Sequence, residues 1–241
     1  MKVLNVGNSF SVDATRYLYS LAKKNNLDMT NGNLYIGGCP LVKHYENMQD
    51  KNKREYVYFY NGQNTKIFVG LEDVWSDKWE YVTFQQASFT SVDYSTYQPY
   101  LNELIAHVKS VIPDIKVVLH QTWAYKNGTE LLLDKAKYES HDKMFSDVKS
   151  SYDKAVKEVK PDVYIRSGEV VQKCYDKGLN MYRDELHLSL GVGRFAASLT
   201  WLCTLYNLNA KKVKLCEFDE PVSKKDVKIV KKIVNEVLGV K

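Results

Sequence analysis

The segment Val3-Leu4-Asn5-Val6-Gly7-Asn8-Ser9 is a short apolar run that ends in Gly-Asn-Ser and leads into sequence with a helical period. Such a run predicts a β-strand followed at once by a helix. A serine at this junction lies at the carboxyl edge of a sheet, beside the backbone N–H groups of a helix start. Ser9 is therefore a candidate nucleophile.

A serine hydroxyl is a weak nucleophile unless a histidine removes its proton and a carboxylate holds that histidine in the required tautomer. Asp184-Glu185-Leu186-His187 supplies both groups within one turn, near the far end of the chain. We expect Asp184 to accept a hydrogen bond from one ring nitrogen of His187 while the other ring nitrogen faces Ser9. Glu185 is the competing carboxylate, although a side chain adjacent to the correct one generally points elsewhere.

The rest of the chain alternates apolar runs rich in β-branched residues with longer segments of helical period. This alternation is typical of βαβ units around a parallel sheet, so we predict an α/β fold. The predicted strands are Val3–Val6, Leu34–Ile36, Tyr81–Phe84, Ile115–Leu119 and Val163–Ile165. The predicted helices are Ser11–Asn26 with Ser11 as its N-cap, Tyr100–Val111, Tyr138–Lys157, Glu169–Asp176, Gly191–Tyr206 and Lys224–Leu238.

Two apolar segments interrupt this alternation, Tyr56–Tyr60 and Lys66–Val69, and they flank Asn61-Gly62-Gln63-Asn64. An Asn-Gly pair between two apolar runs is a strong hairpin signal. We therefore expect a small antiparallel insertion on the rim of the sheet.

The chain has 241 residues, of which 44% are hydrophobic, and no segment has the composition of an interdomain linker. We predict a single domain over residues 1–241. The net charge of +5 comes from lysines that alternate with acidic residues, which is typical of solvated helix faces and not of a nucleic-acid-binding surface. The cysteines have no CxxC spacing, so we expect neither a zinc site nor a disulfide framework from Cys39, Cys174, Cys203 and Cys216.

The chain begins almost directly with a predicted strand and lacks the charged and apolar regions of a signal peptide. It also has no run of about 18 apolar residues, so we expect no membrane insertion. As it stands the sequence predicts a cytoplasmic protein, and a leader removed ahead of Met1 would make it a secreted one.

Four segments, in the expected order, resemble the SGNH (GDSL-like) hydrolase superfamily and, within it, the branch described as DUF4886 domains: Gly7-Asn8-Ser9-Phe10-Ser11, Gln85-Gln86-Ala87-Ser88, Gln121-Thr122-Trp123-Ala124-Tyr125 and Asp184-Glu185-Leu186-His187-Leu188-Ser189. The resemblance implies a three-layer α/β/α, flavodoxin-like fold with a central, mostly parallel five-stranded sheet and a small β-hairpin insertion. It also implies a catalytic triad of Ser9, His187 and Asp184 that needs no metal or organic cofactor.

Acyl transfer also needs hydrogen-bond donors aimed at the oxyanion. The backbone N–H of Ser9 is one candidate. The second is Gly38, with Gly37 as its neighbour, because a glycine pair directly after a strand lets the backbone approach a substrate closely.

The third donor departs from the superfamily pattern, which places Gly-x-Asn-Asp after the third strand. Here that strand runs into Gln85-Gln86. A glutamine amide donates the same hydrogen bond as asparagine with one more methylene of reach, so Gln85 is the first choice. Gln86 is the alternative, because a one-residue error in the strand end would exchange their faces.

Trp123 and Tyr125 follow the fourth predicted strand and therefore fall on the same edge of the sheet. We predict that they bind substrate, by stacking on a sugar or walling an acyl pocket, with ordinary packing as the alternative. The remaining histidines have no ligand spacing and are expected to be structural or solvated: His44, His107, His120 and His141.

From the resemblance we expect a serine esterase that acts through an acyl-enzyme on small-acyl esters, in particular O-acetyl groups on carbohydrates. Its expected partner is a small-molecule or glycan ester, with no nucleic acid. Two alternatives stay open. One is a lipase or lysophospholipase-type esterase for longer acyl chains, and the other is a non-catalytic glycan-binding protein on the same scaffold.

Overall fold

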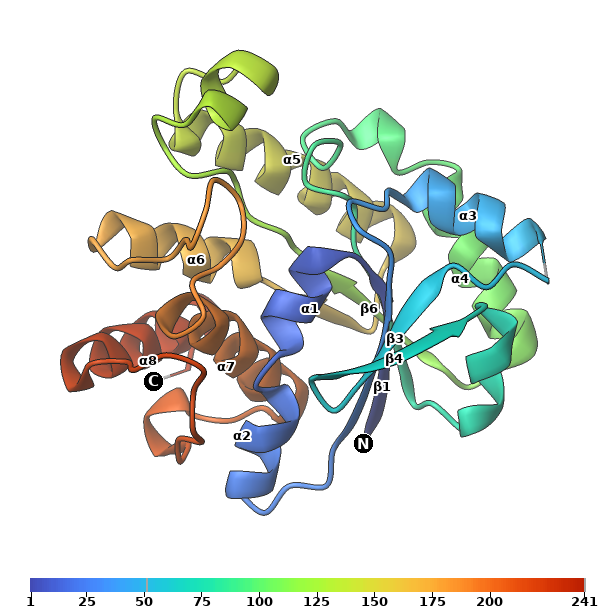
Figure 1. Ribbon diagram of the computed structural model, residues 1–241, viewed down its shortest axis with the longest axis horizontal. Coiled ribbons are helices and arrows are strands. Elements are labelled where there is room, and N and C mark those ends of the chain that lie inside the picture. Colours follow the sequence, from blue (N-terminus) through green and yellow to red (C-terminus); the bar gives the residue numbers. More distant parts are fainter. Residues whose placement is uncertain (51, 241) are drawn as a thin grey trace.

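A seven-stranded sheet runs through the centre of the computed structural model, which describes residues 1–50 and 52–240 (Figure 1). Its strand order is β4-β3-β2-β1-β5-β6-β7. Five strands run parallel to one another: β1 (Lys2–Gly7), β2 (Thr30–Tyr35), β5 (Tyr81–Phe84), β6 (Lys116–His120) and β7 (Val163–Ile165). These correspond to the five predicted strands, and they make the sheet mostly parallel as expected.

The predicted hairpin accounts for the two strands beyond the expected five. Strand β3 (Tyr56–Tyr60) pairs antiparallel with β2, and β4 (Gln63–Val69) pairs with β3. The turn between them is Asn61-Gly62, both of whose φ angles are positive, as a two-residue turn between right-twisted strands requires. The hairpin therefore lies on the rim of the sheet as expected, and its pairing with β2 gives the sheet seven strands in place of the expected five.

Helices cover both faces of the sheet (Figure 1). One layer contains α1 (Ser9–Thr15), α2 (Leu18–Lys24), α6 (Ser167–Asp176), α7 (Val192–Tyr206) and α8 (Lys224–Leu238). The other contains α3 (Leu41–Gln49), α4 (Tyr100–Val111) and α5 (His141–Val159). The short helical turns are η1 (Glu72–Asp77), η2 (Tyr94–Thr96), the π-helical η3 (Leu131–Lys135) and η4 (Ala210–Lys212).

Each face of the sheet carries its own hydrophobic core. In β1, Val3 packs against the layer of α1 and α7, whereas Leu4 and Val6 pack against the layer of α3 to α5. Successive residues of a strand point to opposite faces, so a central parallel strand must be apolar on both sides. The three-layer α/β/α architecture follows from this two-sided burial.

The predicted helix Ser11–Asn26 is two helices, α1 and α2, because a side chain of α7 breaks it. The Ser198 hydroxyl donates to the Ala14 carbonyl at 2.8 Å and accepts from the Tyr17 N–H at 3.1 Å. These two bonds replace helical ones at the junction. The first helix also begins earlier than expected, at Ser9, with Asn8 as its N-cap.

Within the described residues, no helix is both long and apolar enough to cross a bilayer.

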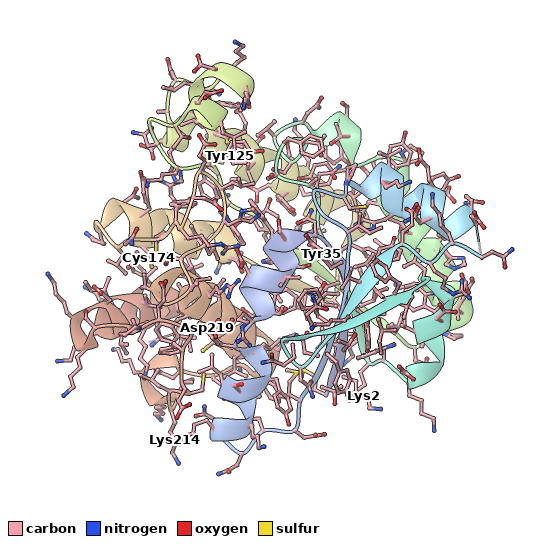
Figure 2. All side chains as sticks on the ribbon, viewed as in Figure 1. Lys2, Tyr35, Tyr125, Cys174, Lys214 and Asp219 are labelled. Carbon is pink, nitrogen blue, oxygen red and sulfur yellow. The ribbon has the colours of Figure 1, made fainter. Side chains whose placement is uncertain are left out.

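The direction in which the parallel strands are added reverses at β1, and such a reversal forms a crevice at one edge of the sheet. The chain passes from β1 to β2 on one side, and it later returns to place β5, β6 and β7 on the other side of β1. In such sheets ligands bind beyond the carboxyl ends of the strands, where the direction of winding reverses. In Figure 2, Tyr35 and Tyr125, which lie at or beyond the carboxyl ends of β2 and β6, both lie above Lys2 at the amino end of β1.

Candidate active site

Ser9 lies at this reversal point, as the first residue of α1 directly beyond β1. Asn8 fixes the start of the helix, because its Oδ1 accepts a hydrogen bond from the Phe10 N–H at 3.0 Å. The Asn8 side chain also accepts from Gln85 Nε2 at 2.8 Å and donates to the Cys39 carbonyl at 3.2 Å. The helix cap beside Ser9 is thus bonded to the loops that follow β5 and β2.

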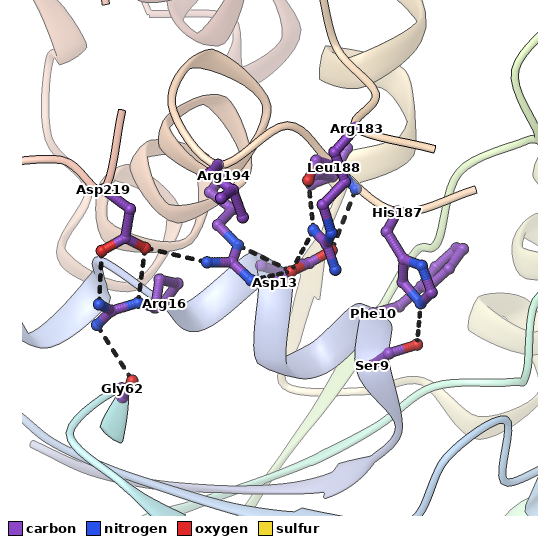
Figure 3. Close-up of polar contacts among 12 residues, drawn as sticks. Ser9, Phe10, Asp13, Arg16, Gly62, Arg183, His187, Leu188, Arg194 and Asp219 are labelled. Carbon is purple, nitrogen blue, oxygen red and sulfur yellow. Dashed lines mark hydrogen bonds and ion pairs between the residues drawn. The ribbon is translucent and has the colours of Figure 1, made fainter. Parts of the chain in front are cut away.

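The structure brings His187 and Asp184 to Ser9 in the predicted order. His187 Nε2 lies 2.9 Å from Ser9 Oγ, and His187 Nδ1 lies 2.8 Å from Asp184 Oδ2 (Figure 3 shows the first of these contacts). A carboxylate only accepts hydrogen bonds, so Nδ1 carries the proton and Nε2 is left to accept from the serine hydroxyl. This is the hydrogen-bond order that activates a serine nucleophile.

Asp184 is held by its own turn as well as by the imidazole. Its Oδ1 accepts from the backbone N–H of Leu186 at 2.9 Å and of His187 at 2.6 Å. Partial burial raises the pKa of the Asp184 carboxyl, but the backbone bonds and the His187 ring outweigh burial and hold that pKa below its ordinary value. Asp184 therefore stays ionised in the range where His187 has to act as a base.

Glu185, the competing carboxylate, forms hydrogen bonds with residues other than His187. Its Oε1 accepts from the Leu131 N–H at 3.1 Å, and its backbone carbonyl accepts from the Lys126 N–H at 2.7 Å. Both bonds are to the segment that follows β6. The geometry thus favours Asp184 over Glu185 as the partner of His187.

Gln85 lies between Asn8 and a buried histidine. Its Nε2 donates to Asn8, and its Oε1 lies 2.8 Å from His120 Nδ1. Burial lowers the pKa of His120 from 6.5 to about 3, so the ring is neutral, and the carbonyl orientation of Gln85 assigns the proton to Nδ1. Within the described residues, the second amide hydrogen of Gln85 has no hydrogen-bond acceptor.

Gln86 has no donor left for a substrate. Its two amide hydrogens go to the carbonyl and hydroxyl of Thr96 at 2.9 and 3.0 Å. Its Oε1 accepts from the backbone N–H groups of Leu41 and Ala87 at 3.0 and 2.8 Å. The alternative that Gln86 supplies the oxyanion donor is therefore corrected, since this side chain ties the loop after β5 to the start of α3.

Gly37 and Gly38 are exposed in the turn after β2, as close approach of a substrate requires. Gly38 has φ +61°, and an added Cβ would meet no atom within 4 Å. The turn is closed by a bond from the Cys39 N–H to the Ile36 carbonyl, and Cys39 is also the residue bonded by Asn8. The backbone beside Gly38 is thus attached to the helix cap beside Ser9.

Trp123 and Tyr125 are buried, which corrects their prediction as substrate-stacking residues. The Trp123 ring stacks on Phe10 with a centroid distance of 4.1 Å, and its Nε1 donates to the Leu186 carbonyl at 2.9 Å. Tyr125 forms a hydroxyl contact of 3.0 Å with Ser88. Trp123 therefore supports the residues next to Ser9 and His187 from inside the core, and neither ring offers a free face.

Phe89 was not identified from the sequence as a residue near the candidate site. Phe89 is 56% exposed in the turn just after β5. Because β5 lies beside β1, this ring is on the same edge of the sheet as Ser9. An aromatic residue so soon after the predicted strand and the two glutamines was the available signal.

The other histidines pair with neighbouring groups. His44 Nδ1 lies 2.9 Å from the Tyr56 hydroxyl, His107 Nε2 lies 2.8 Å from Glu72, and His141 Nδ1 lies 2.6 Å from the Tyr125 carbonyl. In residues 1–50 and 52–240 no group of three or more His, Cys, Asp or Glu side chains is arranged to hold a metal ion.

The chain matches one protein family over nearly its whole length. Residues 2–236 match the family described as "Domain of unknown function (DUF4886)". A crystal structure of a DUF4886 family protein from Bacteroides uniformis is similar with a TM-score of 0.90 and 30% identity, covering 100% of this chain and 96% of that one. A comparison with curated proteins finds no match.

More distant solved structures share the fold. A putative SGNH hydrolase from Slackia heliotrinireducens has a TM-score of 0.61 at 20% identity, covering 85% of this chain and 98% of that one. The acetylxylan esterase Axe2 from Geobacillus stearothermophilus has a TM-score of 0.53 at 14% identity, covering 86% and 92%. The flavodoxin-like SGNH hydrolase fold expected from the sequence is thereby confirmed.

Proposed function

The chain belongs to the DUF4886 family, and because its fold is that of SGNH hydrolases we propose that it is a serine esterase with Ser9 as nucleophile. The observation that carries this proposal is the unbroken hydrogen-bond chain from Ser9 Oγ through His187 to Asp184, with contacts of 2.9 and 2.8 Å. Its three members come from two segments, with Ser9 and His187 separated by 178 positions in sequence.

The reaction proceeds in two halves. Ser9 Oγ attacks the ester carbonyl while His187 Nε2 takes the hydroxyl proton, and His187 then returns this proton to the departing alcohol, leaving an acyl-serine. In the second half His187 takes a proton from water, which attacks the acyl carbonyl, and Ser9 recovers its proton as the acid leaves. Asp184 holds the imidazole in one tautomer and stabilises the imidazolium formed in each half.

Three donors stabilise the oxyanion of the tetrahedral intermediates. Two are the backbone N–H groups of Ser9 and Gly38, and the third is the free amide hydrogen of Gln85. Gln85 is well suited to this role because Asn8 and His120 fix the two ends of its amide, so it needs no reorganisation when charge develops.

The proposed substrates are small-acyl esters, in particular O-acetyl groups on carbohydrates. With Trp123 and Tyr125 buried, the exposed ring of Phe89 is the side chain best suited to contact a sugar at this edge. Phe89→Ala should raise KM for an acetylated oligosaccharide by about two- to tenfold, the range expected for loss of one aromatic contact. Phe68→Ala is the matched control, because Phe68 is 62% exposed but lies on β4.

A panel of p-nitrophenyl acetate, butyrate and octanoate, measured beside acetylated xylo-oligosaccharides, tests the function. We expect kcat/KM to fall with chain length and the oligosaccharides to release acetate. A profile that rises through octanoate, with no acetate released from the oligosaccharides, would replace this proposal with the lipase-type alternative. No turnover of any ester, combined with oligosaccharide binding, would support a glycan-binding protein.

A further inference from the structure

Asp13 is a carboxylate with a side chain only 1% exposed, one helical turn after Ser9 on α1. Three separate groups bond to it (Figure 3). Arg183 Nη1 lies 3.0 and 2.8 Å from its two oxygens, Arg194 donates from Nε at 2.8 Å, and the Leu188 N–H donates at 3.1 Å. Burying a charge is costly unless the charge is paired and hydrogen-bonded. The Asp13 carboxylate is paired with two arginines and accepts a backbone hydrogen bond.

Two of these partners flank the segment that carries the candidate acid–base pair. Arg183 directly precedes Asp184, and Leu188 directly follows His187. The segment is also closed at its base, because the Arg183 N–H donates to the His187 carbonyl at 3.0 Å. The Arg183 side chain additionally donates to the Leu188 carbonyl. One carboxylate therefore anchors both ends of the turn that presents His187.

The same carboxylate is rigidly connected to the nucleophile. Residues four apart on a helix lie on one face, so Asp13 and Ser9 face the 183–188 segment together. The helix fixes the separation of these two residues, and the Asp13 bonds fix the segment to the helix. The 2.9 Å contact between Ser9 Oγ and His187 Nε2 is a second link between the helix and this segment.

We propose that Asp13 is a positioning residue for the esterase reaction: through Arg183 and Leu188 it sets the distance and orientation of His187 relative to Ser9. This inference rests on the proposed function, but it concerns a residue that touches neither substrate nor the reacting atoms. A misplacement of about 1 Å in a reacting group lowers a rate by up to about 100-fold, so the effect of losing this anchor is measurable.

Asp219 provides a matched control. It also accepts from two arginines, with Arg16 Nη2 at 2.6 Å and Arg194 Nη1 at 3.0 Å. Within the part of the chain that the structure describes, Asp219 forms no hydrogen bond or ion pair with residues 183–188, as Figure 3 shows for the residues drawn. Asp219→Asn thus removes a carboxylate charge from the same network without releasing the His187 segment.

The experiment compares Asp13→Asn and Asp219→Asn in p-nitrophenyl acetate hydrolysis and thermal unfolding. We expect Asp13→Asn to lower kcat by about 10- to 100-fold with KM changed less than about threefold. Asp219→Asn should keep kcat within about twofold even if its Tm falls. Equal kcat values for the two variants at equal loss of Tm would show that Asp13 only stabilises the fold, and would overturn the proposal.

Arg183→Gln covers the case in which Asp13→Asn does not fold, since the Arg183 side chain is partly exposed. It should lower kcat in the same way, and an unchanged kcat would overturn the proposal. Crystal structures of these variants give a readout that needs no substrate, because the Ser9 Oγ to His187 Nε2 distance should lengthen beyond hydrogen-bonding range in Asp13→Asn or Arg183→Gln only. If the wild type hydrolyses no ester, the esterase proposal fails, and this distance still decides the role of Asp13.

Discussion

The two halves of the candidate site are held in different ways. On the nucleophile side, Ser9 is supported by Asn8, Gln85 and His120, all buried and joined by short hydrogen bonds inside the core. On the acid–base side, the side chains of His187 and Asp184 are 25% and 45% exposed.

The difference shows which forces position each half. The nucleophile side is fixed by the sheet, by the helix start and by a buried polar cluster. The acid–base side is a surface turn that an ion pair from Arg183 and a hydrogen bond from the Leu188 N–H hold to the buried carboxylate of Asp13. We therefore expect truncation of the buried side chains that support Ser9, such as Asn8 and Gln85, to lower both rate and stability, and conservative substitutions in the turn to alter mainly rate.

The largest expected effect is that of Ser9→Ala. It should leave the fold intact and lower ester turnover by roughly 10³-fold or more, the loss typical of a triad nucleophile. Steady-state hydrolysis of p-nitrophenyl acetate measures it, with circular dichroism as the check on folding. Residual activity within about tenfold of wild type would rule Ser9 out as the nucleophile.

Asp184→Asn should come next, with a loss of at least about 10²-fold in kcat. An amide in place of the carboxylate favours the wrong imidazole tautomer, so Nε2 no longer accepts the Ser9 proton. Glu185→Gln is the control, and it should do much less because Glu185 bonds to the segment after β6. The reverse ranking of the two variants would mean that Glu185 is the partner of His187.

Gln85→Ala and Gln86→Ala distinguish the proposed oxyanion donor from its structural neighbour on the nucleophile side. Loss of an oxyanion donor typically raises the barrier by about 2.7–4 kcal/mol, so Gln85→Ala should lower kcat by about 10²-fold or more with a smaller change in KM. Gln86→Ala should lower Tm instead, because it releases four hydrogen bonds: one to the Leu41 N–H of α3, one to the Ala87 N–H and two to Thr96. A larger kcat effect for Gln86→Ala at unchanged Tm would contradict this assignment.

The smallest effect concerns stability and pH. Burial lowers the pKa of both His44 and His120 from 6.5 to about 3. The unfolded chain therefore binds more protons than the folded protein between these values, and the stabilisation present above about pH 6.5 is lost as pH falls. At pH 5 this loss is roughly 2 kcal/mol for each histidine.

Urea denaturation at pH 7 and pH 5 measures this dependence. His120→Gln should reduce it by roughly the share of one histidine, since glutamine does not titrate in this range. His107→Gln is the control, because His107 is partly exposed beside Glu72. An unchanged pH dependence in His120→Gln would show that His120 is not buried in its neutral form.

The local sequence pattern was sufficient to predict structure where residues close together in the sequence determine it. The apolar run Val3–Val6 and the Asn61-Gly62 pair predicted the central strand and the hairpin correctly. The spacing of Asp184 and His187 predicted a contact that the structure contains, because one turn of chain is enough to form it.

The pattern failed where distant residues decide the outcome. The early part of β2 is polar, and it is a strand because buried amides pair across the sheet, with Asn5 Nδ2 donating to Asn31 Oδ1 at 2.7 Å. The break between α1 and α2 depends on Ser198, and the burial of Trp123 depends on its stacking against Phe10. Nothing in the local pattern distinguishes Asp13 within the predicted helix Ser11–Asn26, because its arginine partners are 170 and 181 positions away in sequence.

The most direct test of the central claim is covalent labelling with diethyl p-nitrophenyl phosphate, followed by intact mass and peptide mapping. The account predicts a single phosphoryl adduct on Ser9, formed in the wild type, absent in Ser9→Ala and much slower in Asp184→Asn. Ser11 lies in the same peptide and serves as an internal control, because its hydroxyl is buried and bonded to the Asn8 carbonyl at 2.8 Å. No adduct on the wild type, or an adduct on any serine other than Ser9, would contradict the account.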